Sequence, residues 1–241
     1  MNTELTNRSF WESYWESYQY EKIPKKVPFA YLMSKLKNKK SFIEIGGFPG
    51  TYATYFYKSG CKDVWLLDFF IDKKIVNQVE EKNNVPLNTI KCIEADFFKY
   101  NTCAKYEIVF SIGFIEHFEN TSDAISRHVN LLADNGSMLL LIPNFRGLNG
   151  FIQKIADKRN YEAHNLQSMI PSYLKSILHQ LKLKNIAVKY SKKPIVWLEP
   201  GVGNRGGRLL IKGLSYMLKL FPVRCRLLSP FIIIYAEKSD I

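Results

Sequence analysis

The feature that most limits the fold of this chain is a repeated alternation of short β-type runs with helix-type stretches. The β-type runs are rich in Val, Ile, Leu and Phe, and amphipathic stretches or turn residues separate them. The first such runs cover residues 42–45, 64–68, 89–94, 107–112 and 137–142. Strands separated by helices pair in parallel through right-handed crossovers, because each helix must pack back onto a twisted sheet. The alternation therefore predicts an α/β fold with a doubly wound, mostly parallel sheet and helices on both faces.

The remainder of the chain extends this pattern. Residues 144–165 are rich in Asn, Gly and charge, so we expect a loop or lid after the fifth strand. Further on we predict a helix over 172–181 opened by Pro171, a strand over 185–190, a helix over 209–220 and a strand over 231–236. Ahead of the sheet, aromatic residues at helical spacing predict an amphipathic helix over 8–20.

The size of the chain indicates one domain. With 241 residues, 46% of them hydrophobic, it can bury one substantial core but hardly two. We expect a single domain over 1–241, made of a helical cap (1–40), a core (41–145) and a part with the lid and the last strands (146–241).

Three absences in the sequence bear on where the protein works. The N-terminal segment contains Glu4, Glu12 and Glu16 in place of an apolar signal stretch. The longest apolar runs are far shorter than the roughly 20 residues of a membrane-spanning helix. The four cysteines form no CxxC pair and have no histidine at ligand spacing, so we expect neither disulfides nor a bound metal. We therefore expect a soluble protein of the cytoplasm.

Residues with useful chemistry follow each of the first strands. The first strand runs into EIGGFPG (44–50), whose glycines either let a ligand approach the backbone or only make a tight turn. The second strand ends at Asp68, where a carboxylate can accept hydrogen bonds from both hydroxyls of a ribose. The third strand is followed by Asp96, which either accepts a bond from an adenine amino group or caps the next turn. The fourth strand leads into SIGFIEHF (111–118). Because ligands bind outside the carboxyl ends of such strands, the four elements predict one nucleoside site.

These motifs together resemble the class I S-adenosylmethionine-dependent methyltransferases, of the branch that includes small-molecule and ubiquinone-type O-methyltransferases. The resemblance covers about residues 41 to 145 and rests on EIGGFPG, LLD ending at Asp68, EADFF around Asp96, YEIVFSIGFIEHF and LLADNGSMLLLIPNF, in the family's order and spacing. It implies a Rossmann-like seven-stranded sheet of order 3-2-1-4-5-7-6 with an antiparallel last strand. It also implies S-adenosylmethionine as the cofactor.

The resemblance assigns roles to individual residues. It implies that the glycine motif shapes the methionine side of the cofactor pocket, that Asp68 holds the ribose, and that Asp96 with Phe97 frames the adenine. The cofactor-binding residues implied are Glu44, Gly46, Gly47, Gly50, Asp68, Phe69, Asp96, Phe97, Ser111, Ile112 and Gly113. One position departs from the family pattern, since Phe48, followed by Pro49, replaces the middle glycine and is expected to narrow the pocket. A dinucleotide is the alternative cofactor, but its turn carries GxGxxG, whereas the register here is GGxxG.

Two histidines are the candidate catalytic residues. Methyl transfer is an in-line displacement with a good leaving group, so alignment and desolvation supply much of the acceleration. For a hydroxyl acceptor, a histidine is the natural group to remove the proton. His117 follows the fourth strand and His164 lies in the expected lid. The alternative for His117 is a structural role or a contact with the cofactor, and the alternative for His164 is a position on the surface. The aromatic helix over 8–20 either covers the cofactor or packs on the core.

The charge of the chain restricts the acceptor only broadly. A net charge of +12 favours an anionic partner such as nucleic acid, a phosphorylated sugar, an acidic lipid or a membrane surface. Residues 203–226 combine Arg and Lys with large apolar residues, so they either lie on an anionic bilayer, cover a lipid-like acceptor, or form a packed cap with snorkelling lysines.

Three functions from different classes follow. The first is a small-molecule O-methyltransferase acting on a hydroxyl of a sugar, a quinone-like compound or a natural product. The second is an RNA or protein methyltransferase, and the third is a cofactor-binding scaffold without catalysis. A fold resemblance does not decide the acceptor. We favour the first, because the sequence contains no recognised RNA-binding module.

Overall fold

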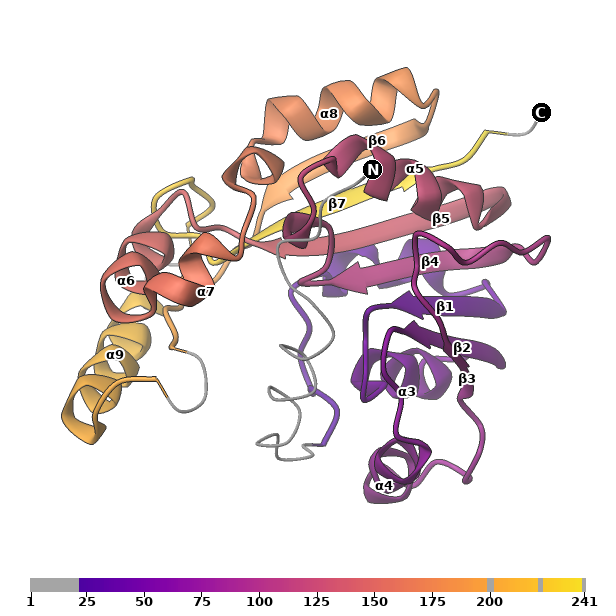
Figure 1. Cartoon of the computed structure of the whole chain (residues 1–241), viewed down its shortest axis with the longest axis horizontal. Coiled ribbons are helices and arrows are strands. Elements are labelled where there is room, and N and C mark those ends of the chain that lie inside the picture. The colour runs from indigo at the N-terminus through magenta and orange to yellow at the C-terminus, as the bar shows by residue number, and fades with distance from the viewer. Residues whose placement is uncertain (1–21, 199–201, 221–222, 240–241) are drawn as a thin grey trace.

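The computed structural model describes residues 22–198, 202–220 and 223–239, so the predicted helix over 8–20 lies outside the described part. Its central feature is a seven-stranded sheet of order β3-β2-β1-β4-β5-β7-β6 (Figure 1). The strands are β1 (Ser41–Ile45), β2 (Asp63–Asp68), β3 (Lys91–Glu94), β4 (Tyr106–Ile112), β5 (Leu132–Pro143), β6 (Lys184–Tyr190) and β7 (Phe231–Glu237). Strands β1 to β5 pair in parallel, and β7 runs antiparallel to both β5 and β6. The expected fold class and strand order are confirmed.

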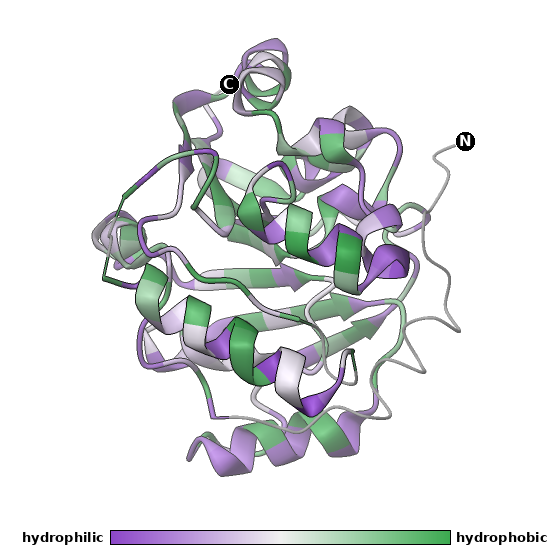
Figure 2. Ribbon diagram, turned by 90° about the vertical axis from the view of Figure 1, so that its left-hand side faces the viewer, coloured by the Kyte–Doolittle hydropathy of each residue, from purple (hydrophilic) through white to green (hydrophobic). Residues whose placement is uncertain are grey.

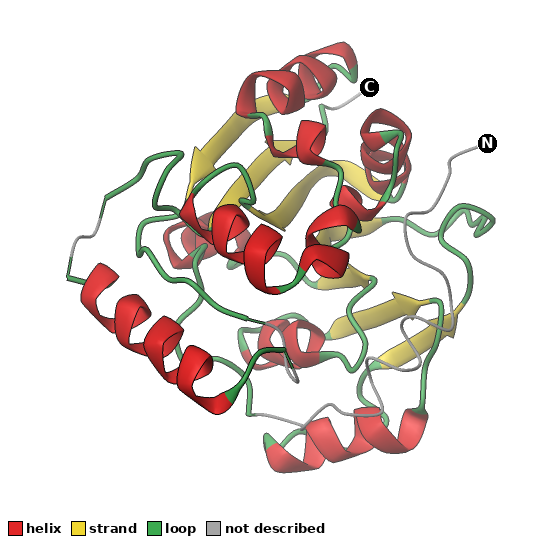
Figure 3. Cartoon of the chain, turned by 60° about the vertical axis from the view of Figure 1, so that its left-hand side comes forward, coloured by secondary structure: helices red, strands yellow, loops and turns green. Residues whose placement is uncertain are grey.

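Helices cover both faces of this sheet (Figure 3). The helical elements are η1 (Ala30–Leu32), α2 (Met33–Leu36), α3 (Thr51–Lys58), α4 (Lys73–Lys82), η2 (Ile115–His117), α5 (Thr121–Asn130), α6 (Leu148–Ala156), α7 (Lys158–Glu162), η3 (Leu166–Met169), α8 (Pro171–Gln180) and α9 (Arg205–Leu218). Helices α2, α3 and α4 pack on one face, and α5 and α8 pack on the other. No helix within the described ranges is both long enough and apolar enough to cross a membrane.

The central strands supply side chains to two cores, one on each face. In β5, Met138 and Leu140 join the core beneath α5 and α8, whereas Leu139 and Leu141 join the core beneath α2, α3 and α4. This alternation follows from the period of two along a strand. Because both faces are covered, the central strands are continuous apolar runs in the sequence, which is why their positions could be predicted.

The segment expected to form a loop or lid is largely helical, so the loop interpretation is wrong, and a lid stays a prediction. Residues 148–156 form α6 and residues 158–162 form α7. Helix α6 buries polar residues, Asn149 and Gln153, and exposes apolar ones, Phe151 and Ile155. A helix with this inverted pattern has no apolar stripe facing the core, and that stripe is the signal by which an amphipathic helix is predicted.

A long excursion that contains α9 separates β6 from β7. Since β6 runs in the same direction as β5, the excursion begins and ends at the carboxyl edge of the sheet. Its base is closed by two hydrogen bonds, from the Ser191 N–H to the Phe231 carbonyl (2.9 Å) and from the Ser229 hydroxyl to the Ser191 carbonyl (2.8 Å). Helix α9 lies beyond α6 in Figure 1 and has no fully buried residue. It therefore contributes no fully buried side chain to either core.

The core beneath α2, α3 and α4 is predicted to depend on its stacked aromatic rings. The ring of Phe56 is fully buried, and its centroid lies 4.3 Å from that of Phe42. We expect Phe56→Ala to lower the free energy of unfolding in urea by about 3–5 kcal/mol, through lost burial and a residual cavity. The control is Leu87→Ala at a position that is 57% exposed, where we expect a change within about 0.5 kcal/mol. A loss below about 1 kcal/mol for Phe56→Ala would contradict this assignment of the core.

Candidate functional site

Four neighbouring strands bring the predicted site residues to one edge of the sheet. In the strand register, Ile45 of β1 pairs with both Leu67 of β2 and Ser111 of β4. Asp68, the last residue of β2, pairs with Glu94 of β3. The chain order reverses between β1 and β4, and this is the position at which open α/β sheets bind ligands.

Three glycines of the turn from β1 into α3 are in positions that favour glycine, and one of them is Gly50, which has a φ of +89°. Gly46 has a φ of +62°, and a Cβ there would lie 2.2 Å from the ring of Phe114. A Cβ at Gly47 would lie 2.1 Å from the carboxyl carbon of Glu44. Gly46 is therefore fixed by its backbone geometry and by a close neighbour, and Gly47 is fixed by a close neighbour alone. The contact also adds Phe114 to the residues around the turn, which sequence reasoning did not single out.

Glu44 anchors the helix that follows this turn. Its Oε2 accepts a hydrogen bond of 2.7 Å from the backbone N–H of Ala53, in the first turn of α3. The side chain is fully enclosed, and this burial raises the pKa of Glu44 to about 8, while the bond from Ala53 opposes the rise and the charge of Asp68 adds to it. Glu44 thus sits beneath the turn as a support, with its carboxyl group directed to the helix.

Asp68 holds the middle of the same turn. Its Oδ2 accepts from the backbone N–H of Phe48 at 2.9 Å, and its Oδ1 accepts from that of Phe70 at 3.3 Å. Burial raises the pKa of Asp68 to about 6, against the lowering effect of the N–H groups of Phe48, Phe70 and Phe69. Each carboxylate oxygen can accept more than one hydrogen bond, so these contacts leave capacity for a further donor.

Phe48 does not take the position expected from the sequence. We expected its bulk to narrow a pocket, but the side chain is buried in the core beneath α2, α3 and α4. Its ring meets that of Phe70 edge to face at 5.5 Å. The core therefore accommodates the side chain that replaces the family's glycine, and the backbone N–H of Phe48 donates a hydrogen bond to Asp68.

The residues after β3 and β4 lie beside the turn. Asp96 Oδ1 accepts from the N–H of Phe98 at 2.9 Å, and Oδ2 lies 3.1 Å from the ammonium group of Lys99. These contacts are those of a turn cap, so an adenine contact for Asp96 stays a prediction. Phe97 is buried with its ring centroid 5.3 Å from that of Phe114. Ser111 and Ile112 end β4, and Gly113 follows with a φ of +65°.

The two candidate catalytic histidines, far apart in sequence, lie together in the structure. The ring centroids of His117, in η2, and His164, after α7, are 4.6 Å apart. The Nδ1 of His117 lies 2.9 Å from the carbonyl oxygen of Ala163, and that of His164 lies 2.6 Å from that of Asn160. Burial lowers the pKa of His117 to about 3 and the pKa of His164 to about 4, so both rings are neutral near pH 7. Their catalytic role stays a prediction.

Glu116 is a functional candidate that sequence reasoning missed. It is fully buried next to the two histidines, and neither carboxyl oxygen has a hydrogen-bond partner of acceptable geometry among the described residues. Burial raises the pKa of Glu116 to about 8, and the backbone N–H groups of Glu116 and Phe114 offset only part of the rise. The signal in the sequence was a Glu beside a His at the end of a central strand, but its burial could not be read from the pattern.

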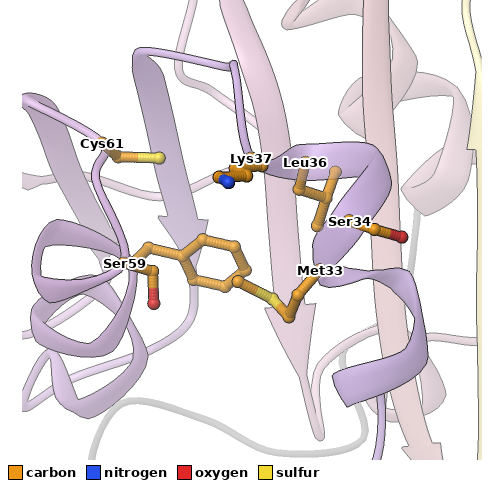
Figure 4. Close-up of a pocket in the computed structure, with 7 residues that line it drawn as sticks. Met33, Ser34, Leu36, Lys37, Ser59 and Cys61 are labelled. Carbon is orange, nitrogen blue, oxygen red and sulfur yellow. The ribbon is translucent and has the colours of Figure 1, made fainter.

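A separate cavity of about 220 Å³ lies between α2 and the end of α3 (Figure 4). Its lining residues are Met33, Ser34, Leu36, Lys37, Phe56, Ser59 and Cys61. These residues precede the first residues of β1 and β2 or lie on the helices above them, so the cavity is at the amino edge of the sheet. Burial raises the pKa of the Cys61 thiol to about 11, which leaves it protonated at neutral pH. The cavity is separate from the candidate site.

Comparisons with known proteins agree with this geometry. A family model described as a methyltransferase domain matches residues 14–188. No curated protein matches the sequence significantly. The structure resembles that of an S-adenosylmethionine-dependent methyltransferase from Archaeoglobus fulgidus, with a TM-score of 0.56 and 16% identity over 86% of this chain and 93% of that chain.

Two further solved structures share the fold. One is a possible histamine N-methyltransferase from Thermotoga maritima, with a TM-score of 0.55 and 13% identity over 87% of this chain and 86% of that chain. The other is a phosphoethanolamine N-methyltransferase from Haemonchus contortus, with a TM-score of 0.58 and 14% identity over 95% of this chain and 57% of that chain. At these identities the likeness establishes the fold.

The buried carboxyl of Glu44 predicts a pH-dependent stability. Between its ordinary pKa of 4.5 and its raised pKa of about 8, the folded protein keeps a proton that the unfolded chain has released. The free energy of unfolding therefore falls as the pH rises through this range. We expect Glu44→Gln to make this fall shallower in urea titrations between about pH 5 and 8.5, because glutamine does not titrate. Glu81→Gln, at an exposed position on α4, is the control and should keep the wild-type slope; equal slopes for Glu44→Gln and the wild type would contradict the prediction.

Proposed function

Because the chain belongs to the methyltransferase domain family, we propose that it transfers the methyl group of S-adenosylmethionine to a hydroxyl group of a small molecule. The observation that carries this proposal is the position of the glycine turn. The turn lies where the strand order reverses, and the N–H of Phe48 ties it to Asp68 on the next strand. A bare backbone and a carboxylate are thus presented together at the edge where a nucleoside binds.

The residues at this edge fit the cofactor. Gly46 and Gly47 let the turn pack directly against the ring of Phe114 and the carboxyl group of Glu44, which holds its backbone at the carboxyl edge of the sheet. Asp68 keeps acceptor capacity for the ribose hydroxyls, and Phe97 offers an aromatic ring near the end of β3. When bound, S-adenosylmethionine supplies a methyl group activated by its sulfonium charge. The chain's contribution is to hold the nucleoside, align the acceptor and exclude water.

A small, anionic or polar acceptor is the second part of the proposal. Solved structures of the same fold include enzymes named for histamine and for phosphoethanolamine, and the net charge of +12 here favours an anionic acceptor. His117 and His164 are the proposed groups at the acceptor end, since they are neutral and lie together. The four free cysteines fit a reducing compartment, and we place the activity in the cytoplasm.

The test of the proposal is calorimetry with S-adenosylmethionine and with its demethylated product. We expect both to bind the wild type, and we expect Asp68→Ala and Asp68→Asn to bind about 10- to 100-fold more weakly, as for loss of hydrogen bonds to a charged group. Asp63→Asn, at the opposite end of the same strand and exposed, is the matched control with unchanged affinity.

The fold of each variant is checked by thermal denaturation, since the Asp68 carboxylate also supports the turn. Asp68→Asn keeps one oxygen as an acceptor for the N–H of Phe48, so it separates loss of charge from loss of the turn. A wild-type protein that binds neither compound would overturn the proposal, and so would an Asp68→Ala variant with wild-type affinity.

A further inference from the structure

Three side chains in η2 and in the segment after α7 form a compact set of metal-binding groups. Glu116, His117 and His164 each offer one ligand atom, and these atoms all lie within 4.8 Å of one another. We propose that this triad holds a divalent transition-metal ion and that the ion binds the acceptor hydroxyl. The inference rests on the proposed function for its chemistry, whereas metal binding can be measured without it.

Glu116 is the member of the triad that most needs a cation. Both of its carboxyl oxygens are buried, and neither has a hydrogen-bond partner of acceptable geometry among the described residues. An unpaired carboxyl group in a protein interior is costly, and such groups normally are neutralised, paired or coordinated to a metal. A divalent ion at this point would coordinate one or both of these carboxyl oxygens.

The two histidines have the orientation of metal ligands. Each holds its Nδ1 against a backbone carbonyl oxygen, that of Ala163 for His117 and that of Asn160 for His164. An Nδ1–H that donates to a carbonyl places the lone pair of the neutral ring on Nε2, which is the usual arrangement for metal-bound histidine.

The backbone holds the two parts of the triad together. The N–H of Asn165 donates to the carbonyl of Glu116 at 2.7 Å, and its side-chain amide donates to the carbonyl of Phe118 at 3.0 Å. Together with the bond between His117 and the carbonyl of Ala163, these bonds hold the residues on both sides of His164 against η2 and Phe118. A site whose ligands are held in advance in this way loses little conformational freedom when it binds an ion.

Two imidazole nitrogens and one carboxylate suit Zn²⁺ and related transition-metal ions, with coordination positions left open for water or substrate. A hydroxyl bound at an open position becomes more acidic, and its proton leaves to solvent. The acceptor oxygen then uses a lone pair to form the bond to the methyl carbon. The carbon–sulfur bond breaks, and its electron pair stays on sulfur, which becomes the neutral thioether of the product.

The test measures metal binding directly. The wild type, stripped with a chelator and titrated with Zn²⁺, is expected to bind one ion per chain. Loss of a ligand in Glu116→Gln and in His164→Ala should weaken Zn²⁺ binding by more than about 100-fold. Even the loss of a residue that only hydrogen-bonds to a ligand lowers metal affinity by about 10–100-fold. The matched controls are Glu119→Gln and His179→Ala, exposed residues of the same types, which should bind as the wild type does.

Two measurements keep the outcome clear if a variant folds poorly. Co²⁺ added to the wild type should give visible absorption bands of a site with nitrogen ligands, and Zn²⁺ should remove them. Calorimetry with the demethylated cofactor is run on the same proteins. Cofactor binding without Zn²⁺ or Co²⁺ binding would overturn the metal site alone, whereas loss of cofactor binding in the wild type would overturn the proposed function. Wild-type Zn²⁺ affinity in Glu116→Gln and His164→Ala would also overturn the site.

An independent observation concerns the outer side of α9. Its half-buried face consists of Gly207, Ile211, Leu214, Ser215 and Leu218, which leaves the rest of the helix exposed. One exposed stripe carries Arg205, Arg208, Lys212 and Lys219, and the stripe beside it carries Leu209, Tyr216 and Leu220. We call these two stripes the α9 surface. Figure 2 shows hydrophobic and hydrophilic residues alternating along the helices on this side of the molecule.

We infer that the α9 surface docks on an anionic lipid bilayer. Leu209, Leu210 and Leu220 are each more than half exposed, which is unusual for a group of large apolar residues on one helix. The chain has no acidic residue between Glu199 and Glu237, so the whole excursion is basic. Basic and apolar stripes side by side allow a helix to bury its apolar side chains at a membrane interface while its cations meet lipid phosphates.

The test is sedimentation with vesicles of phosphatidylglycerol and phosphatidylcholine. We expect the wild type to bind anionic vesicles at least tenfold more tightly than neutral ones, with binding that weakens at high salt. Leu209→Glu with Leu220→Glu, and Arg208→Glu with Lys212→Glu, should each reduce binding about tenfold or more. The matched controls on α4 and the loop after it, Lys73→Glu with Lys74→Glu and Leu87→Glu, should bind as the wild type does.

The same variants distinguish a second occupant. Equal binding to both vesicle types, or unchanged binding by both α9 double variants, would overturn the inference. A third outcome would also overturn it: the wild type is a dimer in sedimentation equilibrium, the double variant Leu209→Glu with Leu220→Glu is a monomer, and neither protein binds vesicles. The α9 surface would then join two copies of the chain.

Discussion

Two carboxylates, the buried Glu44 and the half-buried Asp68, hold the backbone turn on which the candidate site is built. Glu44 reaches forward to the first turn of α3, and Asp68 reaches across from β2 to the N–H of Phe48. The turn is therefore tied to a helix and to a neighbouring strand at once. Burial raises the pKa of both carboxyl groups, so the protein gives up some stability to position the turn. The other candidate cofactor-binding residues outside the turn lie beside it, at the end of β4 and directly after β2, β3 and β4.

Much of the fold could be predicted because the sheet is covered on both faces. Strands such as β4 and β5 contain continuous apolar runs, over 108–110 and 138–142, and the positions of these runs in the sequence are clear without knowledge of their neighbours. The strand order is different in kind, since it came from the resemblance of five motifs to a family and not from periodicity. The predicted ends of strands were less accurate, as β5 begins at Leu132 and was expected only from residue 137.

What could not be predicted depends on contacts between distant segments. The helical pattern of α6 is inverted because Gln153 reaches the carbonyl of Trp197, a partner that local spacing does not reveal. Phe48 could be recognised as a departure from the glycine motif, but its burial depends on Phe70 and the core around it. His117 and His164 lie together because hydrogen bonds join η2 to residues 163–165. Local patterns therefore located the elements, while the side-chain environment of the site required the tertiary structure.

The excursion between β6 and β7 leaves and rejoins the sheet at the same edge, and the hydrogen bonds of Ser191 to Phe231 and Ser229 close its base. The pairing of β6 with β7 therefore does not depend on the residues of the excursion beyond these hydrogen bonds. Such an insertion can be lengthened, shortened or exchanged without altering the strand pairing. In evolution, and in engineering, this makes the segment a replaceable module through which one scaffold could acquire new acceptors or new cellular surroundings.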